Sequence, residues 1–121
     1  MSVLTITKES FDATVSQDGI VFVDCWAAWC PPCRAFGPVF EAAAAKHTDI
    51  VFGKVDTEHE NQLAAELGIT SIPTIMAFRD GILVFAQPGA MGATDFDRLI
   101  AAVRGLDMEK VRAEVEAESA A

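Results

Sequence analysis

The sequence contains no tyrosine, few basic residues and only three cysteines. Nine Lys and Arg against eighteen Asp and Glu give a formal net charge of −9. This charge argues against nucleic acid as a partner, because phosphate contacts need clustered basic side chains. Three cysteines are too few for a scaffold held together by disulfides. No run approaches the ~18 consecutive apolar residues that a membrane-spanning helix needs, so we expect no membrane partner.

The length and the two ends of the chain set its predicted organisation. With 121 residues, 51% of them hydrophobic, the chain is long enough for one domain but not for two. We expect a domain over residues 1–105 and a C-terminal extension over residues 106–121, where Met108 and Val111 predict a short helix before a frayed tail. No signal peptide is visible, and Met1 favours a cytoplasmic location, although a mature chain with its signal removed would look the same.

Strand and helix patterns alternate along the chain. Residues 20–25 are almost all apolar without alternation, which is typical of a strand buried on both faces. The segment after Pro31 changes to helical spacing, and Arg79-Asp80-Gly81 predicts a hairpin turn. The predicted strands are 3–6, 20–25, 50–55, 74–78 and 82–85, and the predicted helices are 8–17, 31–43, 63–67 and 96–103. This order predicts an α/β fold, with a mixed central sheet of about five strands and helices on both faces.

Local signals set several boundaries of these elements. Thr7 is predicted to cap the first helix, with Ile6 and Phe11 as the two apolar partners that flank such a cap. Pro38 lies inside the second helix and is predicted to kink it. Gly68 is predicted to end the third helix.

The segment Cys30-Pro31-Pro32-Cys33 carries the most informative chemistry. A strand ends near Trp29 and a helix begins near Pro31, so Cys30 is predicted at or next to the helix N-cap, where unpaired N–H groups favour a thiolate. Pro31 and Pro32 lose no helical hydrogen bond there, but they remove two donors, which leaves the Cys33 N–H as the important one. Cys33, one turn on, is within disulfide reach of Cys30.

Exchange chemistry assigns different tasks to the two cysteines. A thiolate attacks one sulfur of a disulfide, and a second thiol then displaces the product. We expect Cys30 to be the more exposed sulfur that attacks first, and the covered Cys33 to resolve the mixed disulfide.

Other interpretations of the cysteines have less support. A single Cys-x-x-Cys could be half of a zinc site, but there is no second such pair, and His47 and His59 lack ligand-like spacing. We therefore expect no metal. A structural disulfide between such close neighbours at a helix start would be unusual. Cys25 lies in a predicted buried strand and is interpreted as a small core residue.

The residues just described resemble the thioredoxin family. The resemblance covers residues 3–104 in order and implies the thioredoxin fold. It rests on the segment from Val23 to Arg34 with its Cys pair, Gly37-Pro38, Lys54-Val55-Asp56, Ser71-Ile72-Pro73-Thr74, Arg79-Asp80-Gly81 and Gly89-Ala90.

The resemblance implies a role for each matched residue near the cysteines. Cys30 would be the nucleophile and Cys33 the resolving thiol. Asp24 would be a buried carboxylate beneath them, with a raised pKa that lets it exchange protons with Cys33. Its alternative is a strand Asp that merely hydrogen-bonds a neighbour. Lys54 would be the buried lysine that faces Asp24, or alternatively a surface lysine.

The resemblance also implies a surface for the substrate. Pro73 would follow a cis peptide bond and lie against the sulfurs, and the Ile72 backbone would pair with an extended substrate segment. An apolar patch around Cys30 would consist of Trp29, Pro32, Ile72, Gly89 and Ala90. Trp26 is interpreted as a packing residue.

Three positions depart from the family pattern. Pro31 stands where the typical thioredoxin has glycine, although the same Pro-Pro pair also occurs in tryparedoxins. Loss of an N–H donor near Cys30 would weaken its thiolate and favour the disulfide, which predicts a stronger reductant. Cys25 stands where an aromatic residue is usual, and Pro88 where an aliphatic residue is usual.

The resemblance implies a monomeric cytoplasmic protein-disulfide reductase and electron carrier. It would cycle between a dithiol and a Cys30–Cys33 disulfide without a bound cofactor. A flavin- and NADPH-dependent thioredoxin reductase would recharge it, and its substrates would be proteins with disulfides. The alternatives are a more oxidising oxidase or isomerase, a thioredoxin dedicated to one partner, and a non-catalytic binding subunit.

Overall fold

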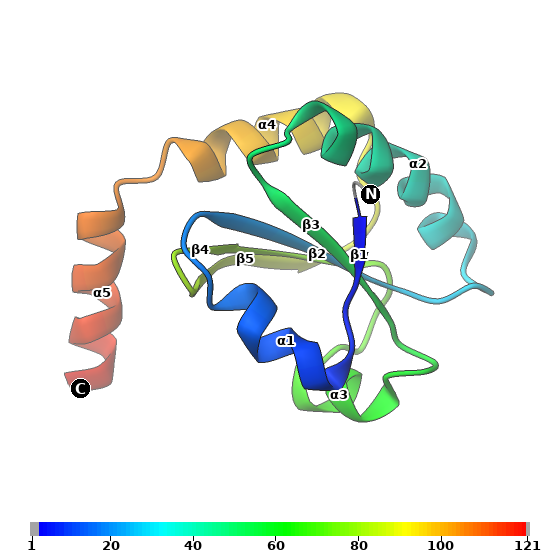
Figure 1. Cartoon of the computed structure of the whole chain (residues 1–121), viewed down its shortest axis with the longest axis horizontal. Helices are drawn as coiled ribbons and strands as arrows, with labels where there is room; N and C mark the ends of the chain where they lie inside the picture. Colours follow the sequence, from blue (N-terminus) through cyan, green and yellow to red (C-terminus); the bar gives the residue numbers. More distant parts are fainter. Residues whose placement is uncertain (1–2, 121) are drawn as a thin grey trace.

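The fold is a five-stranded mixed sheet with helices on both faces (Figure 1). The computed structural model describes residues 3–120. The strands are β1 (Val3–Thr5), β2 (Ile20–Trp26), β3 (Val51–Asp56), β4 (Thr74–Arg79) and β5 (Ile82–Pro88). The helices are α1 (Lys8–Val15), α2 (Pro31–Lys46), α3 (Asn61–Glu66), α4 (Ala93–Arg104) and α5 (Met108–Ala120). The strand order is β1-β3-β2-β4-β5. The first three are parallel to one another, and β4 is antiparallel to both of its neighbours, β2 and β5. The sheet is therefore mixed and closes with an antiparallel hairpin, as predicted.

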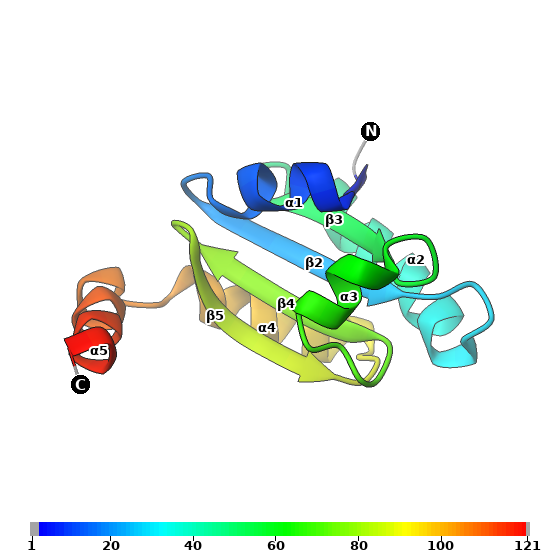
Figure 2. The same cartoon turned by 90° about the horizontal axis from the view of Figure 1, so that it is seen from below.

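Strand β2 lies in the middle of the sheet and is buried on both faces (Figure 2). Its side chains alternate between two apolar clusters: Phe22 packs with α2 and α4, and Val21 and Val23 pack with α1 and α3. Five phenylalanines fill the first cluster, with several rings edge to face, namely Phe22, Phe36, Phe40, Phe52 and Phe96. This double burial explains why the sequence of β2 shows no alternation. It also fixes the end of β2, from which the chain turns into the segment with the cysteines.

Several local predictions are confirmed. Thr7 caps α1 and accepts a hydrogen bond from the Ser10 N–H. Gly68 follows α3 with a φ of 71°. Asp80 and Gly81 form the hairpin between β4 and β5, both with positive φ, as a tight two-residue turn requires. Pro38 lies inside helix α2, which continues through it as one helix, and the kink at Pro38 stays a prediction.

Most element boundaries differ from the prediction by one to three residues, and two of these differences have a clear physical reason. Strand β5 extends to Pro88 rather than ending at 85. Pro88 is compatible with β5 because this is an edge strand, so the missing N–H breaks no ladder. Helix α4 starts at Ala93, with Gly92 as its N-cap, rather than at 96. The sequence pattern misses this first turn because its residues are exposed and give no apolar signal. No helix within residues 3–120 is long and apolar enough to cross a membrane.

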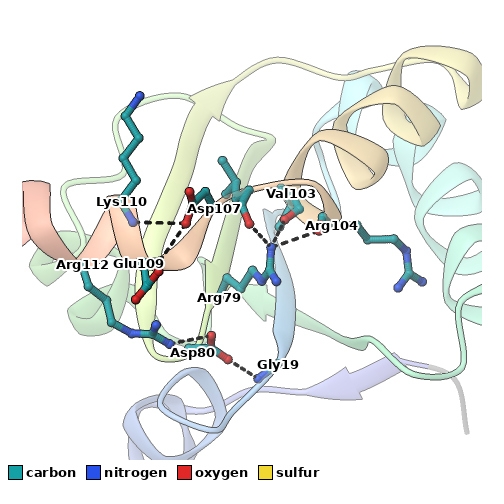
Figure 3. Close-up of polar contacts among 10 residues, drawn as sticks. Gly19, Arg79, Asp80, Val103, Arg104, Asp107, Glu109, Lys110 and Arg112 are labelled. Atoms are coloured by element: carbon teal, nitrogen blue, oxygen red, sulfur yellow. Dashed lines mark hydrogen bonds and ion pairs between the residues drawn. The ribbon is translucent and has the colours of Figure 1, made fainter.

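Helix α5 follows α4 and projects from the end of the domain that carries the β4–β5 hairpin (Figures 1 and 2). Helix α5 continues to Ala120 and so includes the end of the chain, where the sequence predicts a frayed tail. Arg79 at the end of β4 donates hydrogen bonds to three carbonyls, those of Val103, Arg104 and Leu106, at 2.9, 3.1 and 2.9 Å (Figure 3). Asp80 accepts from the Gly19 N–H at 2.9 Å and pairs with Arg112 at 3.0 Å. The hairpin therefore holds both the end of α4 and the first turns of α5.

The two arginines at this junction are expected to contribute unequally to stability. Arg79→Ala removes charged donors from the carbonyls at the end of α4 and should lower the free energy of unfolding by roughly 1.5–3 kcal/mol. Arg112→Ala breaks only an exposed ion pair and should cost less than about 1 kcal/mol. Urea unfolding followed by circular dichroism measures both values. Equal losses for the two variants would contradict the capping role of Arg79.

Candidate functional site

The two close cysteines lie where β2 ends and α2 begins. Cys30 is the N-cap of α2, and its Sγ accepts a hydrogen bond from the Cys33 N–H at 3.3 Å. The position of Cys30 as N-cap and the role of the Cys33 N–H as a donor to its sulfur are as predicted. All three cysteines have free thiols. The backbone of this turn is held by a hydrogen bond from the Cys30 N–H to the Ala27 carbonyl and by one from Arg34 to the Ala28 carbonyl.

The predicted difference in exposure between the cysteines is wrong. Cys30 is 3% exposed and Cys33 is 4% exposed. Both belong to a small cluster with Ala27, against which Trp26 and Ile72 pack. Burial raises the pKa of the Cys33 thiol to about 12, and the neighbouring Cys30 sulfur and Asp24 add to this increase. Cys33 therefore needs a group to take its proton before it can attack.

The loop before β4 lies directly beside the Cys30 sulfur. The Ile72–Pro73 peptide bond is cis, as predicted. The Cys30 thiol donates to the Ile72 carbonyl at 3.7 Å, and the Pro73 carbonyl accepts from the Gly89 N–H at 2.8 Å. These contacts bring together segments that are far apart in the sequence. Four of the predicted site residues, Cys30, Ile72, Pro73 and Gly89, are thus connected by hydrogen bonds or by the chain itself.

The rest of the predicted apolar patch is accessible to solvent. Trp29 is 63% exposed, and Pro32, Gly89 and Ala90 are also exposed, whereas Ile72 is half-buried and Pro73 is buried. Gly89 has a φ of 114°, a backbone conformation that residues other than glycine rarely adopt. An exposed indole beside two nearly buried sulfurs offers apolar contact area to a larger partner.

Asp24 is completely buried in β2, on the sheet face that carries Phe22 and Trp26. Neither of its carboxylate oxygens has a hydrogen-bond partner, so it is not a strand Asp that merely bonds a neighbour. Burial raises the pKa of Asp24 from 3.8 to about 6, and the charge of Lys54 opposes this increase. A carboxyl with this pKa can take up and release a proton near neutral pH.

Lys54 lies opposite Asp24 in the register of β2 and β3. It is half-buried, and its Nζ lies 4.8 Å from the centre of the Trp26 ring. No carboxylate within residues 3–120 forms an ion pair with it. Lys54 therefore faces Asp24 without pairing with it. The contact with Trp26 is missed by the sequence interpretation, although Asp24 and Trp26 two residues apart on one strand already indicate a shared face.

The other candidate ligands lie outside this site. His47 contacts Arg104 at 3.1 Å, and His59 contacts Asp56 at 3.2 Å. No group of three or more His, Cys, Asp or Glu able to hold a metal ion is found among the residues that the structure describes. Cys25 is buried on the opposite face of the sheet, and burial raises the pKa of its thiol to about 12. Such a thiol is an inert core group.

A free dithiol at a helix N-terminus, beside a cis-proline loop and above a buried carboxyl, can exchange electrons with a disulfide. The fold and this site define a thiol–disulfide oxidoreductase. Residues 2–104 match the family described as Thioredoxin. The chain is 50% identical over 111 residues to a Streptomyces coelicolor protein named "Putative thioredoxin 2", covering 92% of this chain and 83% of that protein. It is 42% identical over 93 residues to the thioredoxin of Porphyra purpurea, covering 75% and 87%.

Solved structures give the same result for the fold. The thioredoxin of Malassezia sympodialis (Mala s 13) superposes with a TM-score of 0.74 at 34% identity, covering 83% of this chain and 89% of that one. A mutant thioredoxin from Halobacterium salinarum superposes with a TM-score of 0.78 at 29% identity, covering 87% and 93%. This chain therefore belongs to the thioredoxin family and has the thioredoxin fold.

Proposed function

We propose that this chain reduces disulfides in other proteins through a Cys30/Cys33 dithiol–disulfide cycle. The observation that supports this most directly is the position of the Cys30 sulfur. It lies at the N-cap of α2, accepts the Cys33 N–H and touches the Ile72 carbonyl. A thiolate there is stabilised by the helix N-terminus. A substrate segment that pairs with the backbone of Ile72 would bring its disulfide to this sulfur.

The proposed cycle has two displacements. The Cys30 thiolate attacks one substrate sulfur, which forms a mixed disulfide and releases the other substrate sulfur as a thiolate. Asp24 then takes the proton of Cys33, and the Cys33 thiolate attacks the Cys30 sulfur. This step releases the second substrate sulfur and leaves a Cys30–Cys33 disulfide, so two electrons pass from the protein to the substrate. The raised pKa values of Asp24 and Cys33 support this division of tasks.

Membership of the thioredoxin family supports a thioredoxin reductase as the source of electrons and protein disulfides as the substrates. In this proposal the protein works as a monomer in the reducing cytoplasm. The exposed Trp29, Pro32, Gly89 and Ala90 form the contact surface for both partners. The cycle requires no cofactor or metal on this chain.

A coupled assay tests the proposal. With NADPH, a thioredoxin reductase and insulin, the wild-type protein should support steady NADPH oxidation and insulin precipitation, and Cys30→Ser should support neither. If wild type and variant are equally inactive while a partner protein still binds, the chain is a binding subunit and the proposal is wrong.

The alternative of a more oxidising protein is tested on the same material. Pro31 and Pro32 have no N–H, so the Cys30 sulfur accepts from the Cys33 N–H at the start of α2. A less stabilised thiolate makes the disulfide more favourable and the dithiol a stronger reductant. Equilibration of the Cys30–Cys33 pair with a thioredoxin redox buffer should therefore give a reduction potential well below that of glutathione. A poise close to glutathione's would favour the oxidase or isomerase.

A further inference from the structure

Trp26 lies between the two cysteines and Lys54. Its side chain packs against the cluster of Ala27, Cys30 and Cys33, and its ring faces the Lys54 Nζ at 4.8 Å. Its carbonyl accepts two hydrogen bonds from Thr57, from the N–H and the hydroxyl, both at 2.9 Å. The backbone of Trp26 is thus fixed at the end of β2, and the ring is a rigid surface beneath the ammonium group.

The two carboxylates that line a pocket together with Lys54 already have other partners, and that of Glu60 accepts from the Lys8 N–H at 2.8 Å. The Asp56 carboxylate accepts from the Glu58 N–H at 3.0 Å and pairs with His59 at 3.2 Å. Lys54, Asp56, His59 and Glu60 line one pocket together with Thr5, Ile6 and Trp26. On the side of α2, a Cβ added at Gly37 would lie 3.9 Å from the Lys54 Nζ. The ammonium therefore lies between the Trp26 ring and the backbone of α2, at the edge of an open pocket.

We propose that Trp26 is a positioning residue. Its ring holds the Lys54 ammonium close enough to influence Asp24 and keeps it from moving out into the pocket. The attraction is that of a cation for the face of an indole. This inference rests on the proposed function, because it assigns to Trp26 the control of the carboxyl that serves Cys33. It also changes the interpretation of Trp26 from a packing residue to part of the proton-transfer apparatus.

The arrangement has a clear physical consequence. A buried carboxyl with no cation nearby would hold its proton too firmly, whereas a carboxyl in a direct ion pair would stay ionised and accept none. The charge of Lys54 lowers the pKa of Asp24 against the larger effect of burial, which gives a pKa of about 6. The charge of Asp24 raises the pKa values of two other titratable groups, the Cys33 thiol and, across the sheet on its other face, the Cys25 thiol. Lys54 is thus the cation in this set, and its position adjusts the proton affinity that burial gives to Asp24.

The experiment measures the titration of the Asp24 carboxyl carbon by NMR in the reduced protein, without substrate. If the ring of Trp26 is removed by Trp26→Leu, the ammonium should move into the pocket toward Asp56 and Glu60. The midpoint for Asp24 should then rise by about 0.5 pH unit or more, a part of what a nearby opposite charge supplies. Lys54→Met should raise it at least as much. Trp26→Phe keeps an aromatic face and should stay closer to wild type than Trp26→Leu.

A double-mutant cycle separates this effect from a change in packing. In a Lys54→Met background, Trp26→Leu should leave the Asp24 midpoint almost unchanged. An equal shift in both backgrounds, no shift in the wild-type background, or a downward shift would overturn the proposal. If Trp26→Leu does not fold, fluorinated tryptophan in a Trp29→Phe background weakens the ring's attraction for the cation without changing its shape. It should then raise the midpoint, and an unchanged midpoint would overturn the proposal.

These outcomes are independent of the proposed function. The titration needs no reductase and no disulfide substrate, so it can succeed when the insulin assay fails and fail when that assay succeeds.

Discussion

Replacing Cys33 by serine is expected to leave this protein covalently joined to its substrate through Cys30. The Cys30 sulfur lies at the helix N-cap and can still attack a disulfide. Without the Cys33 thiol, no second sulfur within the chain can displace the product, because Cys25 is buried on the other face of the sheet. Turnover in the coupled assay should fall by roughly three orders of magnitude or more, as when one member of a catalytic unit is removed. Mass spectrometry of the unreduced protein should show a stoichiometric adduct that dithiothreitol releases.

Two matched variants make this result specific. Cys30→Ser should form no adduct, since the two remaining thiols, Cys33 and Cys25, both have a pKa raised to about 12. Cys25→Ala should form no lasting adduct and should turn over like the wild type. Adducts of equal yield with Cys30→Ser and Cys33→Ser would contradict the assigned order of attack.

The order of strands and helices is predictable from the sequence because each element leaves a regular pattern of apolar residues in it. The apolar run of β2 and the helical spacing after Pro31 each reflect one environment along a whole element. Edge and surface segments carry weaker signals. Pro88 extends β5 beyond its predicted end because the edge of a sheet tolerates a missing donor.

The site is predictable where its chemistry is local. The position of Cys30 as N-cap follows from the neighbouring residues alone, and the cis bond before Pro73 follows from the family resemblance. The burial of Cys30 is not local. It depends on Ile72, which is 42 residues away in the sequence and packs against the cysteines only in the folded chain. The contact of Lys54 with Trp26 likewise depends on the register of β2 and β3.

Asp24→Asn is expected to stabilise the protein at neutral pH, and the sign follows from the raised pKa of Asp24. The native carboxyl has a pKa of about 6, against 3.8 without its environment. Between these two values the native state binds more protons than the unfolded state, so stability falls as pH rises and becomes constant above the native pKa. The total loss is about 3 kcal/mol, at 1.36 kcal/mol for each pH unit between the two pKa values. Asparagine has the same shape and no such loss.

The pH dependence distinguishes this cause from a simple change in packing. Near pH 4 the two proteins should unfold at similar urea concentrations, and by pH 8 the variant should be more stable by about 3 kcal/mol. Asp18→Asn, at an exposed carboxylate, should show no comparable difference between the two pH values. A stability gain for Asp24→Asn that is equal at pH 4 and pH 8 would contradict the argument. At the same time the variant should resolve its mixed disulfide more slowly near pH 7, because the amide at this buried position cannot take the proton of Cys33. The stability that this protein loses at Asp24 is thus tied to the proton transfer that its second displacement needs.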